Sequence, residues 1–389
     1  EDSTQVNYSI GIEIRGSSSQ MFDKKSYGFE SRSDDFEDDK DVTMGGFPEE
    51  EDWIFYGPYT DKSLIRNKLT FELSNLIGYK ASKTKFYNLT INDDFKGIYI
   101  LMEKIKRDKN RVDIEKNSGS SVSGGYIIKI DKPTGDGGLC GTCYDDSFSF
   151  RSKYNTQGNL SDLSEIYFLY EYPKADKISD EQKEYIQTYI NDFESSLLSE
   201  EFNDIDNGYL NYIDLDSFIN FFIINEITKN IDGYRLSTFL NKDLNGKLKM
   251  GPIWDFNLAF GNADYCNGWT TTGWGFKFND ICPGDIWQVP FWWNRLMESP
   301  KFKEDLKIRW NDLRLNLLSN QSIKDKLEEY SKYLNDRGAI YQNFSRWDIL
   351  GRYIWPNKFI AYTHEEEIDF MKDWISDRLQ WLDEAILSL

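Results

Sequence analysis

Hydrophobic and polar residues alternate in five short stretches of the first 130 residues. Alternation with a period of two puts successive side chains on opposite faces of an extended chain, so it predicts β-strands. The predicted strands span residues 8–15, 25–29, 85–91, 96–103 and 125–130. A run of small residues, Gly16-Ser-Ser-Ser19, separates the first two strands and is typical of a turn. Residues 8–30 are therefore predicted to form a hairpin.

Three other stretches show the helical period of 3.6. Apolar residues form one stripe along residues 61–76, and Gly78 follows as a stop signal, so this stretch is predicted to be an amphipathic helix. Residues 178–200 and 212–230 also read as helices. The second of them is apolar around most of its circumference, which predicts a buried helix.

The remaining segments are loops, a hairpin and a helical end. Residues 31–52 are acidic and residues 131–162 are rich in Gly, Ser and Cys, so both are predicted to be irregular. Residues 240–250 read as a hairpin around an Asn-Gly turn. The last ~95 residues are predicted to be mostly helical. Trp-rich patches at 287–293 and 347–355 interrupt them.

The length and composition indicate a large globular protein. The chain has 389 residues, more than the ~250–300 at which single hydrophobic cores usually stop growing. Hydrophobic residues make up 39% and aromatic residues 16%, which argues against disorder. We therefore expect one two-lobed unit or two closely packed domains.

The net charge of −20 restricts the partners of the protein. Nucleic acids and anionic membranes both require a strong cationic patch, so neither is an expected partner. No run reaches the ~18 apolar residues of a transmembrane helix, so no integral membrane segment is predicted. A polypeptide substrate would be basic or polar.

Cysteine and histidine usage narrows the chemistry. Four cysteines allow three complete disulfide pairings or a weak metal site, and Cys140 and Cys143 are the only tight pair. Because Cys266 and Cys282 are too far apart to complete a zinc site of close pairs, disulfides are favoured. The single histidine, His364, excludes multi-histidine metal sites and is predicted to lie on a helix surface. Carboxylates, Lys, Arg and hard cations such as Mg²⁺ or Mn²⁺ remain.

Two isolated aspartates, Asp232 and Asp255, stand among apolar residues. An ionised carboxylate in such surroundings costs several kcal/mol unless a cation or several hydrogen-bond donors meet it. Two such sites in succession indicate a divalent-metal or phosphate centre, although a helix N-cap and a turn would also use aspartate. Upstream, the backbone N–H groups of residues 16–19 could cover phosphates, and a lysine on the following strand could reach them.

The order of these parts is that of a protein kinase. Several segments carry a closer resemblance: Ile14-Arg-Gly-Ser-Ser-Ser19 with Lys24-Lys-Ser-Tyr27, Asp61-Lys-Ser-Leu-Ile-Arg-Asn67, Lys96-Gly-Ile-Tyr-Ile-Leu-Met-Glu103, Asn230-Ile-Asp232 and Trp254-Asp-Phe-Asn257. In these segments the chain resembles the spore-coat CotH kinase family, over about residues 10–265. The resemblance implies an α+β, two-lobed atypical protein-kinase-like fold. Its N-lobe, an antiparallel sheet with a helix, would span residues 1–104, and its mainly helical C-lobe residues 105–389.

The resemblance also implies an activity and a set of roles. The expected reaction is ATP-dependent phosphoryl transfer to Ser or Thr of a basic or Ser-rich secreted or surface protein, with Mg²⁺ or Mn²⁺. Asp232 would orient or deprotonate the hydroxyl, and Asp255 would bind metal, helped by Asn257 and Asp232. The residues expected to contact the nucleotide are Arg15, Ser17, Ser18, Lys25 with Lys24 as its alternative, Met102 and Glu103. Glu72 or Arg66 would orient the lysine.

Two departures from the family pattern bear on activity. Asn257 stands where the family usually has a second Asp, which removes one negative charge from the metal site. Ser237 stands where ordinary protein kinases carry a metal-binding Asn. The competing hypothesis is therefore a catalytically weak pseudokinase that serves as an adhesin or binding module, with the Trp patches as contact surfaces. Glycoside hydrolysis by Asp232 and Asp255 is a third reading, but it leaves the lysine-bearing hairpin unexplained. The substrate protein and the oligomeric state stay open.

Overall fold

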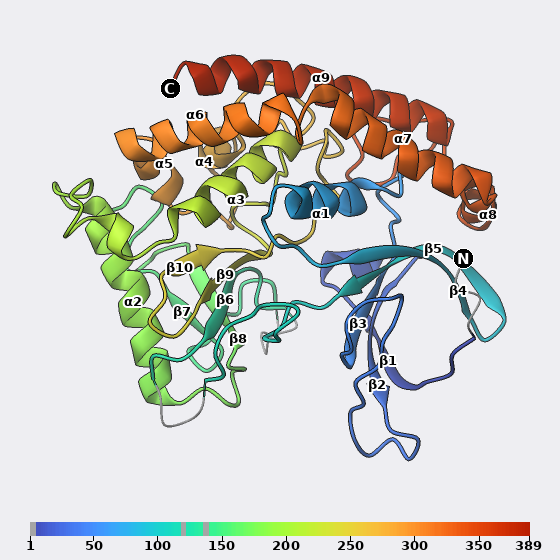
Figure 1. Cartoon of the computed structure of the whole chain (residues 1–389), viewed down its shortest axis with the longest axis horizontal. Helices are drawn as coiled ribbons and strands as arrows, with labels where there is room; N and C mark the ends of the chain where they lie inside the picture. Colours follow the sequence, from blue (N-terminus) through green and yellow to red (C-terminus); the bar gives the residue numbers. More distant parts are fainter. Residues whose placement is uncertain (1–4, 118–121, 135–139) are drawn as a thin grey trace.

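The computed structural model describes residues 5–117, 122–134 and 140–389. Two five-stranded antiparallel sheets lie side by side, and a layer of long helices covers both (Figure 1). The chain completes the first sheet before it enters the second, and its last helix, α9 (His364–Leu387), lies on the side of the layer farthest from the sheets. This mixed architecture confirms the predicted α+β class.

The first sheet has the strand order β1-β2-β3-β5-β4. Its strands are β1 (Ser9–Arg15), β2 (Ser26–Arg32), β3 (Asp52–Tyr56), β4 (Thr84–Ile91) and β5 (Asp94–Glu103). The predicted hairpin is confirmed, because β1 pairs with β2 from Ser9 opposite Arg32 to Arg15 opposite Ser26, with the short helix η1 (Ser18–Met21) between them. Strand β3 was missed, because five residues without alternation give too little periodic signal.

Helix α1 (Arg66–Leu76) begins five residues later than the sequence predicts. Residues 57–65 are irregular and largely buried, and Leu64 has a left-handed backbone with φ 64° that interrupts a helix. The Asp61 carboxylate accepts a hydrogen bond from the backbone N–H of Arg66 at 2.9 Å. Asp61 therefore supports the irregular segment from inside instead of starting the helix.

The second sheet has the strand order β10-β9-β6-β8-β7. Its strands are β6 (Tyr126–Ile130), β7 (Ser149–Arg151), β8 (Tyr167–Tyr172), β9 (Thr238–Lys242) and β10 (Leu248–Met250). Strand β6 and the β9–β10 hairpin confirm two predictions, and Asn245 adopts the left-handed φ of 54° that its turn requires. Strand β7 lies inside the stretch predicted to be a loop, which is a correction.

The predicted helical segments are confirmed. Helices α2 (Asp180–Leu198) and α3 (Leu215–Thr228) match the two predicted central helices, and α3 is buried along nearly its whole length. The short helix η2 (Tyr209–Asn211) lies between α2 and α3. The C-terminal part contains the short helix η3 (Gly275–Lys277), α4 (Phe278–Ile281), α5 (Trp292–Leu296), α6 (Pro300–Leu315), α7 (Asn320–Asp336), α8 (Ala339–Arg346) and α9 (His364–Leu387). Helix α3 packs against α1, α6 and α9 and thus forms the centre of the molecule.

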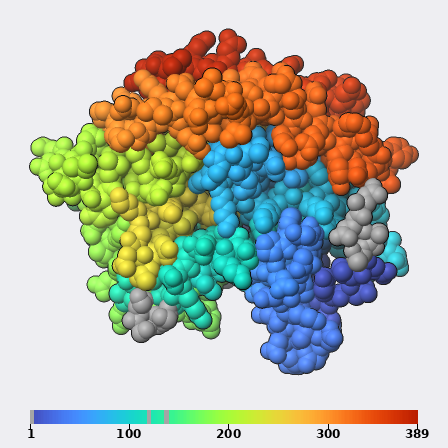
Figure 2. Space-filling model, in the orientation of Figure 1, coloured from blue at the N-terminus to red at the C-terminus, as the bar shows by residue number. Residues whose placement is uncertain are grey.

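One large hydrophobic core runs through both halves of the molecule. It includes side chains from the first sheet, α1, the second sheet, α3 and α9. The space-filling view shows the surface indented at its lower edge, between the blue segments of the first sheet and the teal and green segments of the second (Figure 2). The shared core holds the two sheets in place on either side of this indentation.

The structure corrects the expected surface position of His364 and divides the Trp-rich patches between core and surface. His364 is not on the surface: it is 7% exposed, and its Nε2 lies 2.9 Å from the Ser63 carbonyl oxygen. Burial lowers the pKa of His364, so the imidazole is neutral at physiological pH. Of the Trp-rich patches, Trp292 and Trp293 belong to the core, whereas Trp355 is 46% exposed.

All four cysteines form disulfides, Cys140–Cys143 and Cys266–Cys282. The preference for disulfides over a zinc site is therefore confirmed. Within the described ranges, no helix has both the length and the apolar character needed to cross a bilayer.

Candidate active site

Asp232 lies in a turn that follows the buried helix α3. The helix stops at Lys229, whose backbone is left-handed with φ 42°. The Lys229 ammonium donates hydrogen bonds to the carbonyl oxygens of Asn267 at 3.2 Å and Thr272 at 2.6 Å. Burial lowers the pKa of Lys229 to about 8. These contacts fix the turn, and the Asp232 side chain is 24% exposed.

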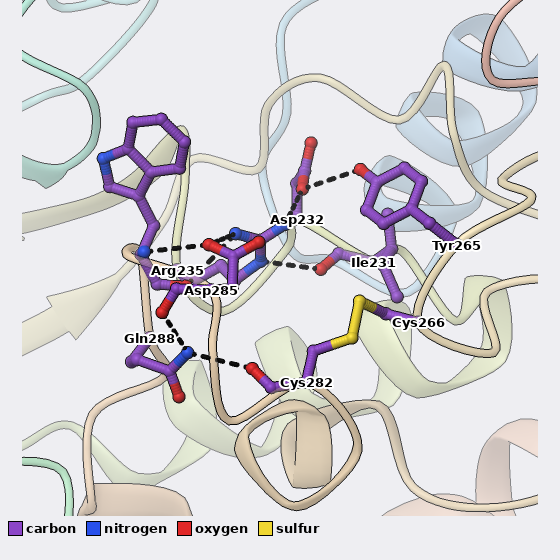
Figure 3. Close-up of a disulfide and its surroundings, with 9 residues drawn as sticks. Ile231, Asp232, Arg235, Tyr265, Cys266, Cys282, Asp285 and Gln288 are labelled. Carbon is purple, nitrogen blue, oxygen red and sulfur yellow. Dashed lines mark hydrogen bonds and ion pairs between the residues drawn. A yellow bond between two sulfur atoms is a disulfide. The ribbon is translucent and has the colours of Figure 1, made fainter.

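The Asp232 carboxylate has two polar neighbours. The Arg235 guanidinium donates to its Oδ1 at 2.6 Å, and the Tyr265 hydroxyl donates to the same oxygen at 3.4 Å (Figure 3). Arg235 is only 3% exposed and also donates to Asp285 at 3.2 Å. Sequence reasoning missed these partners, because Tyr265 and Asp285 come from loops far along the chain. Arg235 was detectable, since it stands one helical turn after Asp232.

Asp255 lies in the loop that follows β10, in a strained conformation. Its backbone is left-handed with φ 59°, which costs free energy for any residue with a Cβ. The next residue is tied to α1, because the Phe256 N–H donates to the Asn67 side-chain oxygen at 2.6 Å. The surrounding contacts therefore impose the conformation of Asp255.

Asn230 joins the segments that carry the two aspartates. Its side-chain nitrogen donates to the Asp255 carbonyl oxygen at 3.0 Å, and its side-chain oxygen accepts from the Asp232 backbone N–H at 3.4 Å. Asn230 is 3% exposed, so its side chain is enclosed by the protein where it makes these bonds. The structure thus brings together the two aspartates that the sequence singled out.

The carboxylate of Asp255 lies in a field of like charge. Asp255 is exposed as a residue, but the surrounding protein takes the place of much of the water near its carboxylate. This desolvation, together with the charges of Asp232 and Asp131, raises the pKa of Asp255 to about 6. Arg15 and Lys132 act in the opposite direction. Such a group favours a bound cation, because a cation relieves both the repulsion and the poor solvation.

Arg15 is the one predicted phosphate-binding cation that faces the aspartates. Its guanidinium lies 5.6 Å from the centre of the Trp254 ring. Burial lowers the pKa of Arg15, while the nearby Asp255 and Glu171 raise it. At the end of β1, Arg15 therefore reaches from the first sheet toward the second.

Asp131 and Lys132 are functional candidates that sequence reasoning missed. They directly follow strand β6, and both affect the pKa of Asp255, which Asp131 raises and Lys132 lowers. The Asp131 carboxylate accepts a hydrogen bond from the Ser237 hydroxyl at 3.3 Å. The sequence signal is an acid–base pair directly after an apolar strand, at the start of the stretch 131–162 that is predicted to be irregular.

Lys24 and Lys25 have other partners. Lys24 is 2% exposed, and its ammonium donates to the Asn343 side-chain oxygen at 2.9 Å. Burial lowers the pKa of Lys24 well below the usual value. The Lys25 ammonium donates to the carbonyl oxygens of Gln20 at 2.7 Å and Phe22 at 2.6 Å. These contacts argue against a phosphate contact for Lys24 and give Lys25 the role of holding its own loop.

The other predicted nucleotide contacts are divided between surface and core. Ser17 and Ser18 are exposed in the loop after β1, where they are free to approach a ligand. Met102 and Glu103 are buried at the end of β5, and the Glu103 carboxylate accepts from the Lys83 backbone N–H at 2.8 Å. The Glu103 side chain is thus engaged inside the protein.

The two helix residues expected to orient a lysine lie elsewhere. The Arg66 guanidinium is 2.8 Å from both Asp61 and Glu367 in a fully buried ion-pair network. It also donates to the Ala259 carbonyl oxygen at 3.0 Å, so it supports the loop after Asp255. Glu72 pairs with Lys68 at 3.9 Å.

The predicted metal ligand Asn257 is partly buried, and its side-chain nitrogen lies 3.4 Å from the Thr60 hydroxyl. Among the described residues, a tighter acidic cluster occurs at Glu50, Glu51 and Asp52. The Lys106 ammonium already lies 2.6 to 2.8 Å from all three carboxylates. Lys104 also pairs with Asp52, and Arg111 with Glu50, so three cations balance the three carboxylates. Asp255 is therefore the better metal candidate.

Comparison with known proteins identifies one family. The family model described as "CotH kinase protein" matches residues 12–382, nearly the whole chain. A search of curated proteins finds no match.

Proposed function

The chain belongs to the CotH kinase family, and from this premise we propose that it is an ATP-dependent protein kinase that phosphorylates Ser or Thr side chains of proteins. The observation that carries the proposal is the pairing of Asp232 and Asp255. Asn230 ties their backbones together, and the pKa of Asp255 is raised to about 6 by burial and by its acidic neighbours. Phosphoryl transfer needs one acid for a metal and one for the nucleophile.

In this proposal the two aspartates have different tasks. Asp255 ligates Mg²⁺ or Mn²⁺, and Asn257 lies two residues away as a further oxygen donor. When bound, the cation neutralises charge on the phosphates of ATP. Asp232 accepts a hydrogen bond from the substrate hydroxyl and takes its proton. The ion pair with Arg235 holds the Asp232 carboxylate in place and orients it for that purpose.

We assign the phosphate contacts to Arg15 and Lys132, supported by the exposed loop with Ser17 and Ser18. Both cations lie close enough to Asp255 to lower its pKa, so they would supply positive charge to the phosphates of a nucleotide held beside Asp255. Adenine contacts by the backbone at Met102 and Glu103 remain a prediction. The first sheet, residues 1–104, would cover the nucleotide, and residues 105–389 would carry the catalytic aspartates.

The proposed setting is extracellular or at the cell surface. The two disulfides support it, because disulfides persist in oxidising compartments. The net charge of −20 favours a basic or Ser-rich protein substrate.

The test is transfer of the γ-phosphate of radiolabelled ATP, with Mn²⁺ or Mg²⁺, to the protein and to a basic Ser-rich acceptor. Asp255→Ala is expected to lose both metal-dependent nucleotide binding and transfer. Asp232→Ala is expected to keep most of the binding and lose transfer. Asp336→Asn, on the exposed face of α7, is the matched control and should behave as wild type. Equal labelling of all four proteins would refute the proposal.

A second candidate, a binding module without catalysis, is favoured by exposed aromatic rings. Tyr353, Trp355 and Tyr362 are 52%, 46% and 73% exposed. Aromatic rings of this kind stack on sugars or partner side chains. Failure of wild type to bind nucleotide with any divalent cation would favour this candidate.

A further inference from the structure

A disulfide joins the two loops that meet beside Asp232. Cys266 and Cys282 are 16 residues apart and covalently linked. Cys266 directly follows Tyr265, and Cys282 stands three residues before Asp285. Figure 3 shows the disulfide together with the hydrogen bonds that run from these loops to Asp232 and Arg235. The bridge thus connects two independent supports of one carboxylate.

The first support is the hydroxyl of Tyr265. It donates to Asp232 at 3.4 Å, while the ring stacks on Trp355. Burial and the Asp232 charge raise the pKa of Tyr265, so the phenol keeps its proton and remains a donor.

The turn that carries Tyr265 is strained. Cys266 and Asn267 are both left-handed, with φ 48° and 58°, and the Gly268 N–H closes the turn on the Tyr265 carbonyl oxygen at 2.9 Å. Residues with a Cβ hold this conformation only when neighbouring contacts enforce it. The disulfide is one of these contacts, and the Lys229 bond to the Asn267 carbonyl oxygen is another.

The second support is the guanidinium of Arg235. Asp285 accepts from it at 3.2 Å and also accepts from the Trp287 backbone N–H at 2.9 Å. The Gln288 side chain donates to the Cys282 carbonyl oxygen at 3.1 Å, which ties the loop back to the bridge. Asp285 therefore positions Arg235, and Arg235 positions Asp232 at 2.6 Å.

We propose that the Cys266–Cys282 disulfide is a positioning element of the catalytic site, and that phosphoryl transfer requires its oxidised form. This inference rests on the proposed function, because Asp232 is the acid that it positions. On reduction, the bond between the two sulfur atoms breaks and takes up two electrons and two protons from a dithiol, which becomes a disulfide itself. The strained turn is then free to relax, and Tyr265 and Asp285 lose their shared anchor.

The test compares transfer by the wild type before and after dithiol reduction with transfer by the double variant Cys266→Ser/Cys282→Ser. Misplacement of a catalytic group by about 1 Å can cost ~100-fold, so kcat is expected to fall by roughly 10- to 100-fold. The dissociation constant for nucleotide is expected to stay within about twofold, since the metal and phosphate groups lie on other segments. A fall of kcat and nucleotide affinity together, with loss of thermal stability, would show a merely structural bridge and overturn the proposal.

The chain offers a matched control. Cys140 and Cys143 form the other disulfide, which is exposed. The variant Cys140→Ser/Cys143→Ser should keep wild-type activity and keep its sensitivity to the dithiol. If this variant were instead insensitive, the effect of reduction would belong to Cys140–Cys143, and the proposal would be wrong.

A second variant covers the case in which Cys266→Ser/Cys282→Ser fails to fold, because Tyr265→Phe leaves the bridge intact. It should lower kcat several-fold with unchanged nucleotide binding, and an unchanged kcat would refute the positioning role.

A readout without catalysis separates this inference from the proposed function. Hydrogen–deuterium exchange of the reduced wild type should rise in residues 262–270 and 282–288 and also in residues 230–236. Absence of transfer by the oxidised protein would count against the kinase proposal alone, and the exchange data would then decide on the bridge. Unchanged exchange in residues 230–236 after complete reduction would overturn the positioning role whether or not the protein transfers phosphate.

Discussion

Cation binding at Asp255 is expected to weaken steeply below pH 6. A carboxylate binds Mg²⁺ or Mn²⁺ only after it has lost its proton, so protons compete with the metal. The pKa of Asp255 is raised to about 6, first by burial and then by the charges of Asp232 and Asp131. The competition therefore falls in an accessible pH range instead of near pH 4.

The size of the effect follows from the fraction of Asp255 that is ionised. With a pKa of about 6, the apparent dissociation constant for the cation is multiplied by about 1.1 at pH 7, about 2 at pH 6 and about 11 at pH 5. With the ordinary aspartate pKa of ~3.9, the factor at pH 5 would be only about 1.1. The two cases differ by roughly tenfold at pH 5.

Titration with Mn²⁺, followed by electron paramagnetic resonance of the free ion between pH 5 and 7.5, measures this directly. The absence of nucleotide keeps phosphate protonation out of the curve. Asp255→Asn should lose the pH-dependent binding, and Asp131→Asn should shift the midpoint to lower pH because it removes a charge that raises the pKa of Asp255. Affinity in the wild type that stays constant from pH 7 to pH 5 would refute the reasoning.

Three further outcomes are expected. Because the pKa of Asp255 is raised in the folded protein, its contribution to folding is favourable at about pH 4 and is lost as pH rises to about 6. In the variant Asp255→Asn, the new asparagine tolerates the left-handed φ of 59° and does not ionise. This variant should therefore raise the unfolding temperature of the metal-free protein at pH 7.5 and not at pH 4. Asn230→Ala should lower the free energy of unfolding by about 1–3 kcal/mol in urea titrations, because it removes two hydrogen bonds of about 0.5–1.5 kcal/mol each, and should reduce transfer as well. Lys24→Met should leave nucleotide affinity unchanged in thermal-shift titrations. It should not destabilise the protein either, because the Asn343 side-chain oxygen still accepts a hydrogen bond from the Ile98 N–H. A large loss of affinity would restore Lys24 as a phosphate ligand.

Elements with clear local periodicity were predictable, and those fixed by distant partners were not. Strands β4 and β5 and helices α2 and α3 follow directly from their patterns. The start of α1 does not, because Asp61 resembles an N-cap residue in sequence. Its actual partner is Arg66, which also binds Glu367 near the other end of the chain. No local pattern carries information about a contact over some 300 residues.

The same limit applies to the candidate site. Asp232 and Asp255 stood out because a charge among apolar residues is conspicuous in any sequence. Asp131 and Lys132 did not, since their importance depends on β6 lying next to β9 in the second sheet. Strand alternation would put Lys24 and Lys25 on opposite faces without saying which one faces the site, but β2 begins at Ser26, so that rule does not reach either lysine.

The arrangement around Asp255 weighs in favour of catalysis over a purely adhesive role. A left-handed aspartate whose pKa is raised by burial and by two acidic neighbours makes the metal-free fold less stable. A surface that only bound a partner through exposed aromatic rings would gain nothing from this arrangement. The replacement of a family aspartate by Asn257 removes one charge, but Asp131 still adds its charge to the field at Asp255. A cation bound there would convert the repulsion into attraction, and phosphoryl transfer is the chemistry that uses such a cation next to a second, separately held carboxylate.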